Sequence, residues 1–238
     1  MSTLAENVAK VTAAHAALKT AIAAKGVAVP DGTKLSAMPA LVEQISTESV
    51  PTNPRAVFAG DDATSVVVPK TMVVDMMSVT NLTLCFYNCS SLTSLHLPDG
   101  FGQNAMALVS CFAGCSSLTS LTLPDGFGQN ATTMATCFYN CSSLTSLHLP
   151  DGFGQNAKSF VRTFNNCTAL KNITGNPKFK HSFGLTYSKD LTHDSLMVVI
   201  NGLQIVTTAQ TISLGTTNLA KLTNAEKKVA TDKGWTLA

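Results

Sequence analysis

Hydrophobic and polar positions repeat along the centre of the chain with a period of 26 residues. The segment CSSLTSLHLPDGFGQN occupies residues 89–104 and returns at residues 115–130 and 141–156. The copies differ at one position, where Thr122 stands in place of His96 and His148. A weaker fourth copy begins at Cys167. A period of this length is typical of solenoids, in which each unit buries its apolar face against its neighbours.

Each repeat divides into a segment with helical spacing and a segment with strand spacing. In one copy Asn130 suits a helix N-cap, and apolar residues at helical intervals predict a short helix after it: Met134, Cys137, Phe138 and Cys141. The stretch from Leu144 to Leu149 then has the L-x-x-L-x-L pattern of a leucine-rich repeat, with alternate leucines pointing inward. We expect the copies to stack about 4.8 Å apart, so that equivalent apolar residues form continuous ladders.

The N-terminal segment has a different, seven-residue pattern. Its larger residues alternate at intervals of four and three, the spacing of a coiled-coil seam: Leu4, Val8, Val11, His15, Leu18 and Ile22. One interpretation is a small helical hairpin that packs on itself. The other is a self-association segment that makes a homo-dimer or homo-trimer, although three heptads are marginal for an isolated coiled coil.

The patterns predict an α/β fold, a short leucine-rich-repeat solenoid between an N-terminal helical segment and a C-terminal α/β cap. We assign residues 1–48 to the helical oligomerisation or attachment segment, 49–64 to a linker and first strand, 65–190 to the solenoid and 191–238 to the cap. In the cap, Thr192 suits the N-cap of one helix, and Thr223 with Glu226 forms the capping box of another. Gly234 ends that second helix, and Trp235 is expected to anchor the tail.

Composition narrows the partners. Only 13% of the residues are charged and the net charge is +2, which gives no electrostatic reason to expect nucleic acid or an anionic membrane as a partner. No run of about 18 apolar residues predicts a membrane span. The N-terminus lacks the apolar region of a Sec signal peptide, so we expect the chain to reach any outside location as part of a larger assembly.

The seven cysteines occupy two positions of the repeat, four residues apart. An odd number argues against a disulfide framework, and a C-x3-C pair without a second pair or a histidine is not zinc-site spacing. We therefore expect the cysteines to be small buried hydrophobes stacked in two ladders, and we expect no metal ion and no cofactor.

The outward positions of the predicted strands form uncharged rows rich in hydroxyl groups. They are the candidate residues for binding a protein or a glycan: Thr93, Ser94, His96, Thr119, Ser120, Thr122, Thr145, Ser146 and His148. The alternative is a sheet face that is only solvated. Asp99, Asp125 and Asp151 form a second row, where a divalent cation could bridge neighbours, but Pro-Asp-Gly is also a preferred turn sequence.

The repeat C-x3-C-S-S-L-x-x-L-x-L-P between Cys85 and Pro150 resembles the BspA-like leucine-rich repeats of bacterial surface proteins, over about residues 65–176. The C-terminal segment that starts LTHDSLMVVINGL looks like the terminal module of related proteins of gut bacteria and their prophages. The segment AIAAKGVAVPDGTKLSAMPALVEQI resembles the start of phage tail and tail-fibre-like proteins.

These resemblances imply a protein that is not an enzyme, and the chain has no G-x-S-x-G nucleophile pattern and no phosphate-loop pattern. The first hypothesis is a structural and receptor-binding protein of a phage tail or prophage, which sits in the virion with other tail proteins. The alternative is a BspA-like adhesin on the bacterial cell exterior that binds a host protein or glycan.

Overall fold

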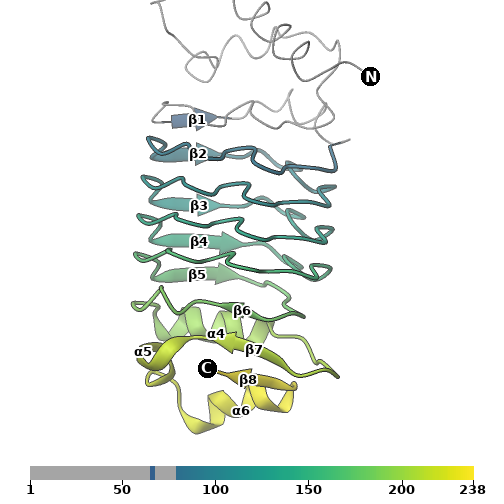
Figure 1. Ribbon diagram of the computed structural model, residues 1–238, viewed down its shortest axis with the longest axis vertical. Coiled ribbons are helices and arrows are strands. Elements are labelled where there is room, and N and C mark those ends of the chain that lie inside the picture. Colours follow the sequence, from purple (N-terminus) through teal and green to yellow (C-terminus); the bar gives the residue numbers. More distant parts are fainter. Residues whose placement is uncertain (1–64, 68–78) are drawn as a thin grey trace, which may run out of the picture.

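A stack of short parallel strands forms the upper part of the molecule in the computed structural model, which describes residues 65–67 and 79–238 (Figure 1). The strands follow one another in chain order: β1 (Ser65–Val67), β2 (Ser94–His96), β3 (Ser120–Thr122), β4 (Ser146–Leu149) and β5 (Asn172–Gly175). Ser120 pairs with Ser146, and Ser146 pairs with Asn172, so each coil is shifted from the next by one sequence repeat. The predicted register of the solenoid is therefore confirmed for these coils.

The helix predicted within each repeat is wrong. Residues 135–140 form a series of turns, and no helix lies within the described coils before the cap. The Phe138 N–H donates to the Thr163 carbonyl of the next coil at 2.9 Å, and every second amide around it does the same: Met134, Thr136 and Asn140. An α-helix would keep these donors within its own segment. Here the adjacent coil provides a matching row of carbonyl acceptors. The amides bond to these carbonyls, so the segment does not form the helix that its apolar spacing predicts.

Within this turn segment, two positions of each repeat have left-handed backbone. One position has Asn or Gly, which tolerate positive φ: Asn88, Gly114, Asn140 and Asn166. The other position, four residues earlier, has residues that do not: Leu84, Ser110, Thr136 and Arg162, with φ between 52° and 62°. The expected N-cap role of Asn130 is also wrong, because its side-chain amide donates to the Gln103 carbonyl of the preceding coil at 2.9 Å.

The core is a set of ladders, as the repeat predicts. Phe112 stacks on Phe86 and Phe138 with ring centroids 5.3 and 5.5 Å away, and Phe164 continues the ladder 5.6 Å beyond Phe138. Leu121 and Leu147 are buried beside it. Because each ring contacts equivalent rings on both sides, the apolar surface of one coil is covered by the next.

The cysteines confirm the prediction of buried thiols. All seven are fully buried thiols, and none of them forms a disulfide. The Sγ of Cys141 donates to the Phe112 carbonyl at 3.1 Å, and Cys115 and Cys167 make the same bond in their own coils. Burial raises the pKa of the Cys167 thiol to about 12 and also raises the pKa of Cys137. These thiols serve packing, and their chemistry is suppressed.

The C-terminal part is an α/β unit that covers the last coil. Its elements are β6 (Phe183–Gly184), α4 (His193–Gly202), β7 (Gln210–Ser213), α5 (Gly215–Leu219), α6 (Asn224–Asp232) and β8 (Trp235–Leu237), with β6, β7 and β8 in one parallel sheet. The N-cap at Thr192, the capping box of Thr223 with Glu226 and the burial of Trp235 are confirmed. β6 precedes residue 191, yet it pairs with β7. The domain boundaries that we assigned remain predictions.

Helix α4 closes the open edge of the strand stack. The Ile173 N–H on β5 donates to the Ser195 Oγ at 2.8 Å, and that hydroxyl donates to the Lys171 carbonyl at 2.9 Å. The Thr192 N–H donates to the same carbonyl at 2.9 Å. The first turn of α4 thus replaces the strand that would otherwise pair with β5, which protects the edge from pairing with another chain.

The predicted helical segment 1–48, with its seam over residues 4–22, lies outside the described residues. So does the linker 49–64.

Candidate binding face

The strands place alternate side chains on one outward face. On β3, Ser120 and Thr122 are exposed while Leu121 between them is buried, and β2 has the same alternation with a less buried leucine. Because β3, β4 and β5 are in register, equivalent residues align across the coils. The structure therefore brings the predicted row residues together on one side of the solenoid.

The serine row is the part of this face that is open to a ligand. The hydroxyls of Ser94, Ser120 and Ser146 have no hydrogen-bond partner among the described residues. Ser94 and Ser120 are exposed, and Ser146 is half-buried. A row of free hydroxyls, each of which can donate and accept, suits the hydroxyl and amide groups of a glycan or a peptide.

The two flanking rows are partly used by the fold. The Thr145 Oγ1 donates to the Thr119 carbonyl at 2.9 Å, which ties one coil to the next. His148 Nδ1 lies 3.0 Å from Thr174 Oγ1, whereas His96 and Thr122 have no described partner. The face therefore consists of one row without described hydrogen bonds between two rows in which Thr145 and His148 bond to an adjacent coil.

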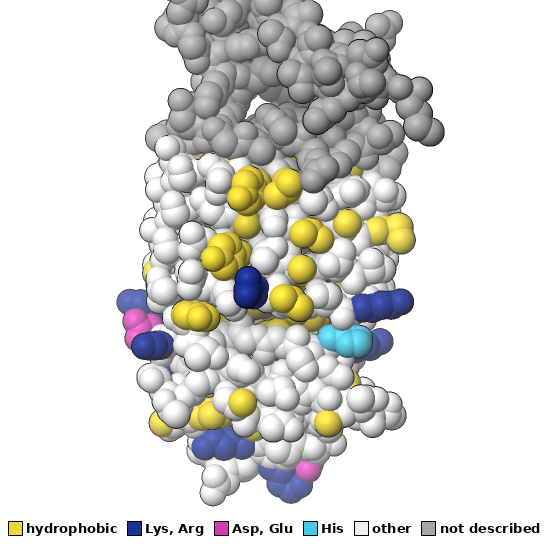
Figure 2. All heavy atoms as spheres, in the orientation of Figure 1, with side chains coloured by type: hydrophobic (Ala, Val, Ile, Leu, Met, Phe, Trp, Pro, Cys, Tyr) yellow, Lys and Arg dark blue, Asp and Glu magenta, His cyan; other side chains and the backbone are white. Residues whose placement is uncertain are grey.

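The face has little charge. Residues 79–151 contain Asp99, Asp125 and Asp151 but no Lys or Arg, and Lys171 is the first cation beside the strands. Figure 2 agrees: it shows no Lys or Arg side chain over the described coils until the level of the solenoid–cap junction. Binding on this face would rest on hydrogen bonds and shape, with little electrostatic steering.

The aspartates are exposed at the turns. Asp151 accepts a hydrogen bond from the Asn176 side-chain amide. Among residues 79–238, no group of three or more His, Cys, Asp or Glu side chains could hold a metal ion. The row fits turn chemistry: in each repeat the residue after the aspartate is a glycine with positive φ, between 73° and 82°. In the described part of the chain, no helix is long and apolar enough to cross a membrane.

Sequence reasoning missed a second surface, at the junction of the solenoid and the cap, where Ile205 is 81% exposed beside several lysines. One signal was available: residues 152–189 contain six Lys or Arg residues and no Asp or Glu. The low net charge of the whole chain conceals this segregation.

Residues 82–188 match the family model of the BspA type leucine rich repeat region, in six copies. This part of the chain is therefore a BspA-type leucine-rich-repeat region, and proteins with this repeat are often surface adhesins and are typically not enzymes. No curated protein and no solved structure matches the chain. Nothing in the comparisons supports the resemblance of the N-terminal segment to phage tail proteins.

Proposed function

We propose that this protein is a bacterial cell-surface adhesin that binds a glycan or a protein of the host through the strand face of its solenoid. The observation that carries the proposal is the free serine row: Ser120 and Ser146 pair in register, Ser94 occupies the equivalent repeat position on the preceding coil, and none of the three hydroxyls has a described hydrogen-bond partner. The BspA-type repeat region supports it, because that repeat is frequent in adhesins.

The uncharged, hydroxyl-rich face favours an uncharged ligand. Each coil contributes one free serine at intervals of about 4.8 Å, so a linear ligand can form similar bonds along the stack. Net contributions of about 1 kcal/mol per neutral hydrogen bond give modest affinity per coil. Several coils acting together then provide useful binding, and multiple copies of the protein on one surface would strengthen it further.

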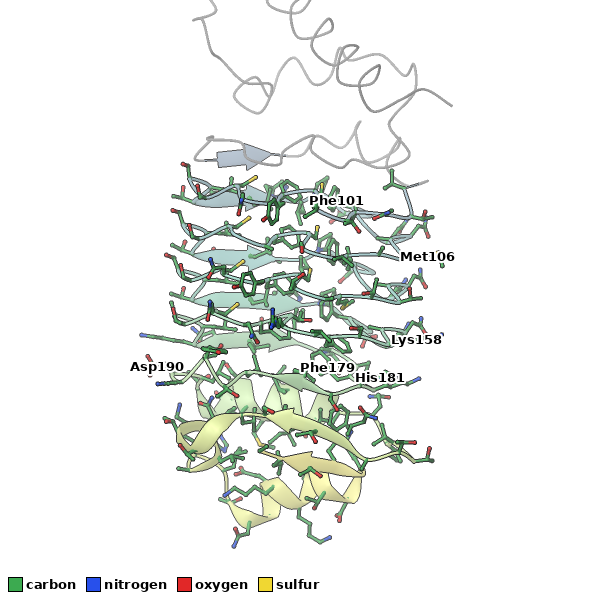
Figure 3. All side chains as sticks on the ribbon, viewed as in Figure 1. Phe101, Met106, Lys158, Phe179, His181 and Asp190 are labelled. Atoms are coloured by element: carbon green, nitrogen blue, oxygen red, sulfur yellow. The ribbon has the colours of Figure 1, made fainter. Side chains whose placement is uncertain are left out.

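The test is the binding of the full chain to an array of neutral glycans, acidic glycans and host matrix proteins, at low and high salt. We expect binding to at least one neutral glycan or protein, and we expect that binding to survive about 1 M salt because screening does not affect uncharged hydrogen bonds. Ser120→Arg should abolish it by covering the serine row. The matched control is Met106→Arg, which adds the same side chain on another side of the coils, where Met106 is 51% exposed (Figure 3). Equal binding by both variants would contradict the assignment of the face.

Self-association through residues 4–22 remains a separate prediction. Light scattering on the full chain and on a chain that starts at Ser49 tests it. A dimer or trimer that becomes a monomer on truncation would support the seam, whereas monomers in both cases would exclude it.

A further inference from the structure

The charged residues of the described chain are segregated along the stack. Residues 79–151 have three aspartates and no cation, whereas residues 152–189 have six cations and no acid: Lys158, Arg162, Lys171, Lys178, Lys180 and Lys189. In Figure 2 the uppermost Lys and Arg side chains accordingly appear where the solenoid meets the cap, and others lie on the lower part of the cap. The structure gives none of these six an ion pair with a described residue.

Three of these lysines gather on one edge, which we call the junction edge. Phe179 is fully buried in an extended segment, so Lys178 and Lys180 on either side of it project outward. The Lys178 N–H donates to the Phe153 carbonyl at 2.8 Å, which places this segment beside the coil that carries Lys158. Figure 3 shows Lys158 and His181 on the same side of the molecule, opposite Asp190.

An exposed isoleucine lies on the junction edge. Ile205 is 81% exposed, the largest value among the exposed large hydrophobic residues of the described chain. The Gln204 N–H donates to the Phe179 carbonyl, and the Val206 N–H donates to the Lys233 carbonyl, each at 2.9 Å. Ile205 is therefore held between the segment of Lys178 and Lys180 on one side and Lys233 on the other.

The lysines on this edge have no carboxylate as a direct partner among the described residues. The Lys233 Nζ donates to the Ile200 and Asn201 carbonyls at 3.1 and 2.9 Å, and partial burial and then the nearby charge of Lys178 lower the pKa of Lys233. The Lys178 Nζ donates to Asn176 Oδ1 at 2.6 Å, and Asn176 in turn donates to Asp151, so this carboxylate reaches the lysine only through an amide.

We propose that the junction edge binds the surface of an anionic lipid bilayer, with Ile205 inserted among the headgroups and Lys158, Lys178 and Lys180 facing the lipid phosphates. Cations around an exposed aliphatic side chain match a bilayer interface, which offers negative charge and an apolar layer at the same place. A hydrated acidic polysaccharide or a nucleic acid would leave Ile205 in water. In addition, no aromatic residue among the exposed large hydrophobic side chains of the described chain lies at positions 178–181 or 203–206, where bases would stack.

This inference goes beyond the proposed adhesion function and uses a different surface. The test is sedimentation of the full chain with vesicles of phosphatidylglycerol, compared with vesicles of phosphatidylcholine, at about 50 mM and 500 mM salt. We expect binding to phosphatidylglycerol at low salt, loss of most of it at high salt, and little binding to phosphatidylcholine, because the lysines act through screened charge.

Two variants separate the charge from the apolar contact. Lys178→Gln with Lys180→Gln should lower the partition coefficient about twenty-five-fold, since each lysine near the surface contributes about fivefold. Ile205→Asn should lower it about tenfold at low salt and leave the salt dependence unchanged. The charge control is Lys189→Gln with Lys227→Gln, which removes the same charge away from the junction edge. The apolar control is Val161→Asn, at a residue that is 63% exposed on a solenoid turn.

Each alternative occupant gives its own result. If dextran sulfate binds wild type and Ile205→Asn equally and displaces the vesicles, the edge is a general polyanion site and the lipid proposal is overturned. Displacement by millimolar inorganic phosphate would show a phosphate site and would also overturn it. Equal sedimentation with both lipids would overturn the lipid proposal. So would variants that bind phosphatidylglycerol vesicles as strongly as their controls do. Trp235 fluorescence and thermal unfolding verify that each variant is folded.

Discussion

The solenoid and the cap bury their apolar side chains in different ways. In the solenoid, one set of residues serves every coil, because translation by one repeat places each phenylalanine, leucine and cysteine against its equivalent. In the cap, each contact is made once, as with the Trp235 Nε1–H that donates to the Gln204 carbonyl at 2.8 Å. The contacts of the solenoid can therefore be predicted from the period of its sequence, whereas the contacts of the cap must be predicted one residue at a time.

The two regions also differ in what their polar groups do. In coils 79–176, most side-chain hydrogen bonds run from one coil to the next and involve neutral groups. The cap contains the ion pairs among the described residues: His193 with Asp194, His193 with Glu226, and Lys228 with Asp232. This difference predicts that alkaline pH, core truncation and edge mutations affect the two regions unequally.

The largest expected effect is alkaline unfolding of the solenoid. Burial raises the pKa of six thiols: Cys85, Cys111, Cys115, Cys137, Cys141 and Cys167, although for Cys115 the hydrogen bond to Cys89 contributes more than burial. The folded state therefore keeps protons that the unfolded chain releases above about pH 9, so the free energy of unfolding falls as pH rises above that value. At about 1.4 kcal/mol per thiol per pH unit, six thiols give about 8 kcal/mol per unit. That is comparable to the whole stability of a domain, so unfolding is expected near pH 10.

Circular dichroism between pH 8 and pH 11 measures this transition. The cap has no cysteine, so Trp235 fluorescence should not show a transition that precedes the loss of the solenoid signal. A urea midpoint that is the same at pH 8 and pH 10 would show that the thiols do not control stability.

Truncation in the middle of the phenylalanine ladder is the next largest effect. Phe138→Ala should lower the free energy of unfolding by about 3–5 kcal/mol, because Phe138 is fully buried and stacks on rings in both adjacent coils. Tyr139→Ala, at the adjacent half-exposed residue, is the control and should cost about 1 kcal/mol. Urea denaturation measures both, and similar losses for the two variants would argue against ladder packing as the main source of stability.

A smaller loss is expected where the two regions meet. Ser195→Ala removes the hydroxyl that accepts from the Ile173 N–H and donates to the Lys171 carbonyl. The buried Ile173 amide then loses its partner, which should cost about 1–3 kcal/mol. Hydrogen exchange should show faster exchange at Ile173. The control is Ser213→Ala, whose side chain has no described hydrogen bond, and protection of Ile173 that is unchanged in Ser195→Ala would refute edge closure by α4.

The smallest effect is a gain in stability. Arg162 is exposed and has φ of 54°, a conformation that costs an L-residue about 1–2 kcal/mol. Arg162→Gly should therefore raise the free energy of unfolding by about 0.5–1 kcal/mol after the added flexibility of the unfolded chain is subtracted. Val161→Gly, at the preceding residue with ordinary φ, should lower it by a similar amount. Thermal unfolding of both variants tests the sign, and a loss at both positions would contradict the left-handed turn.

The sequence predicts the ladders because identical residues at a fixed interval leave one way to stack. It predicts the helix caps of the cap because Thr192 and the Thr223–Glu226 pair bond within their own segments. It fails at residues 135–140, because the spacing of Met134, Cys137 and Phe138 fits a helix as well as a series of turns. The difference lies in whether the amides bond within the segment or to the next coil, and a single repeat contains no information about that partner.

The candidate face is predicted more fully than its chemistry. The alternation of Ser120, Leu121 and Thr122 places the rows on the outside, but only the structure separates the free Ser120 hydroxyl from the bonded Thr145 hydroxyl. The junction edge is not visible in the sequence pattern, because Ile205 and Lys180 are 25 positions apart and their segments become neighbours only in the folded chain, where the Gln204 N–H donates to the Phe179 carbonyl.

The most direct test of the adhesion account is a scan of the serine row with the ligand class that the array identifies. Ser94→Arg, Ser120→Arg and Ser146→Arg place the same side chain on three consecutive coils, with Met106→Arg as the control off the face. The account predicts at least a tenfold loss of affinity for each of the three, largest at Ser120 in the centre, and wild-type affinity for the control. Wild-type affinity for all three folded serine variants would contradict it and leave the strand face as a solvated surface.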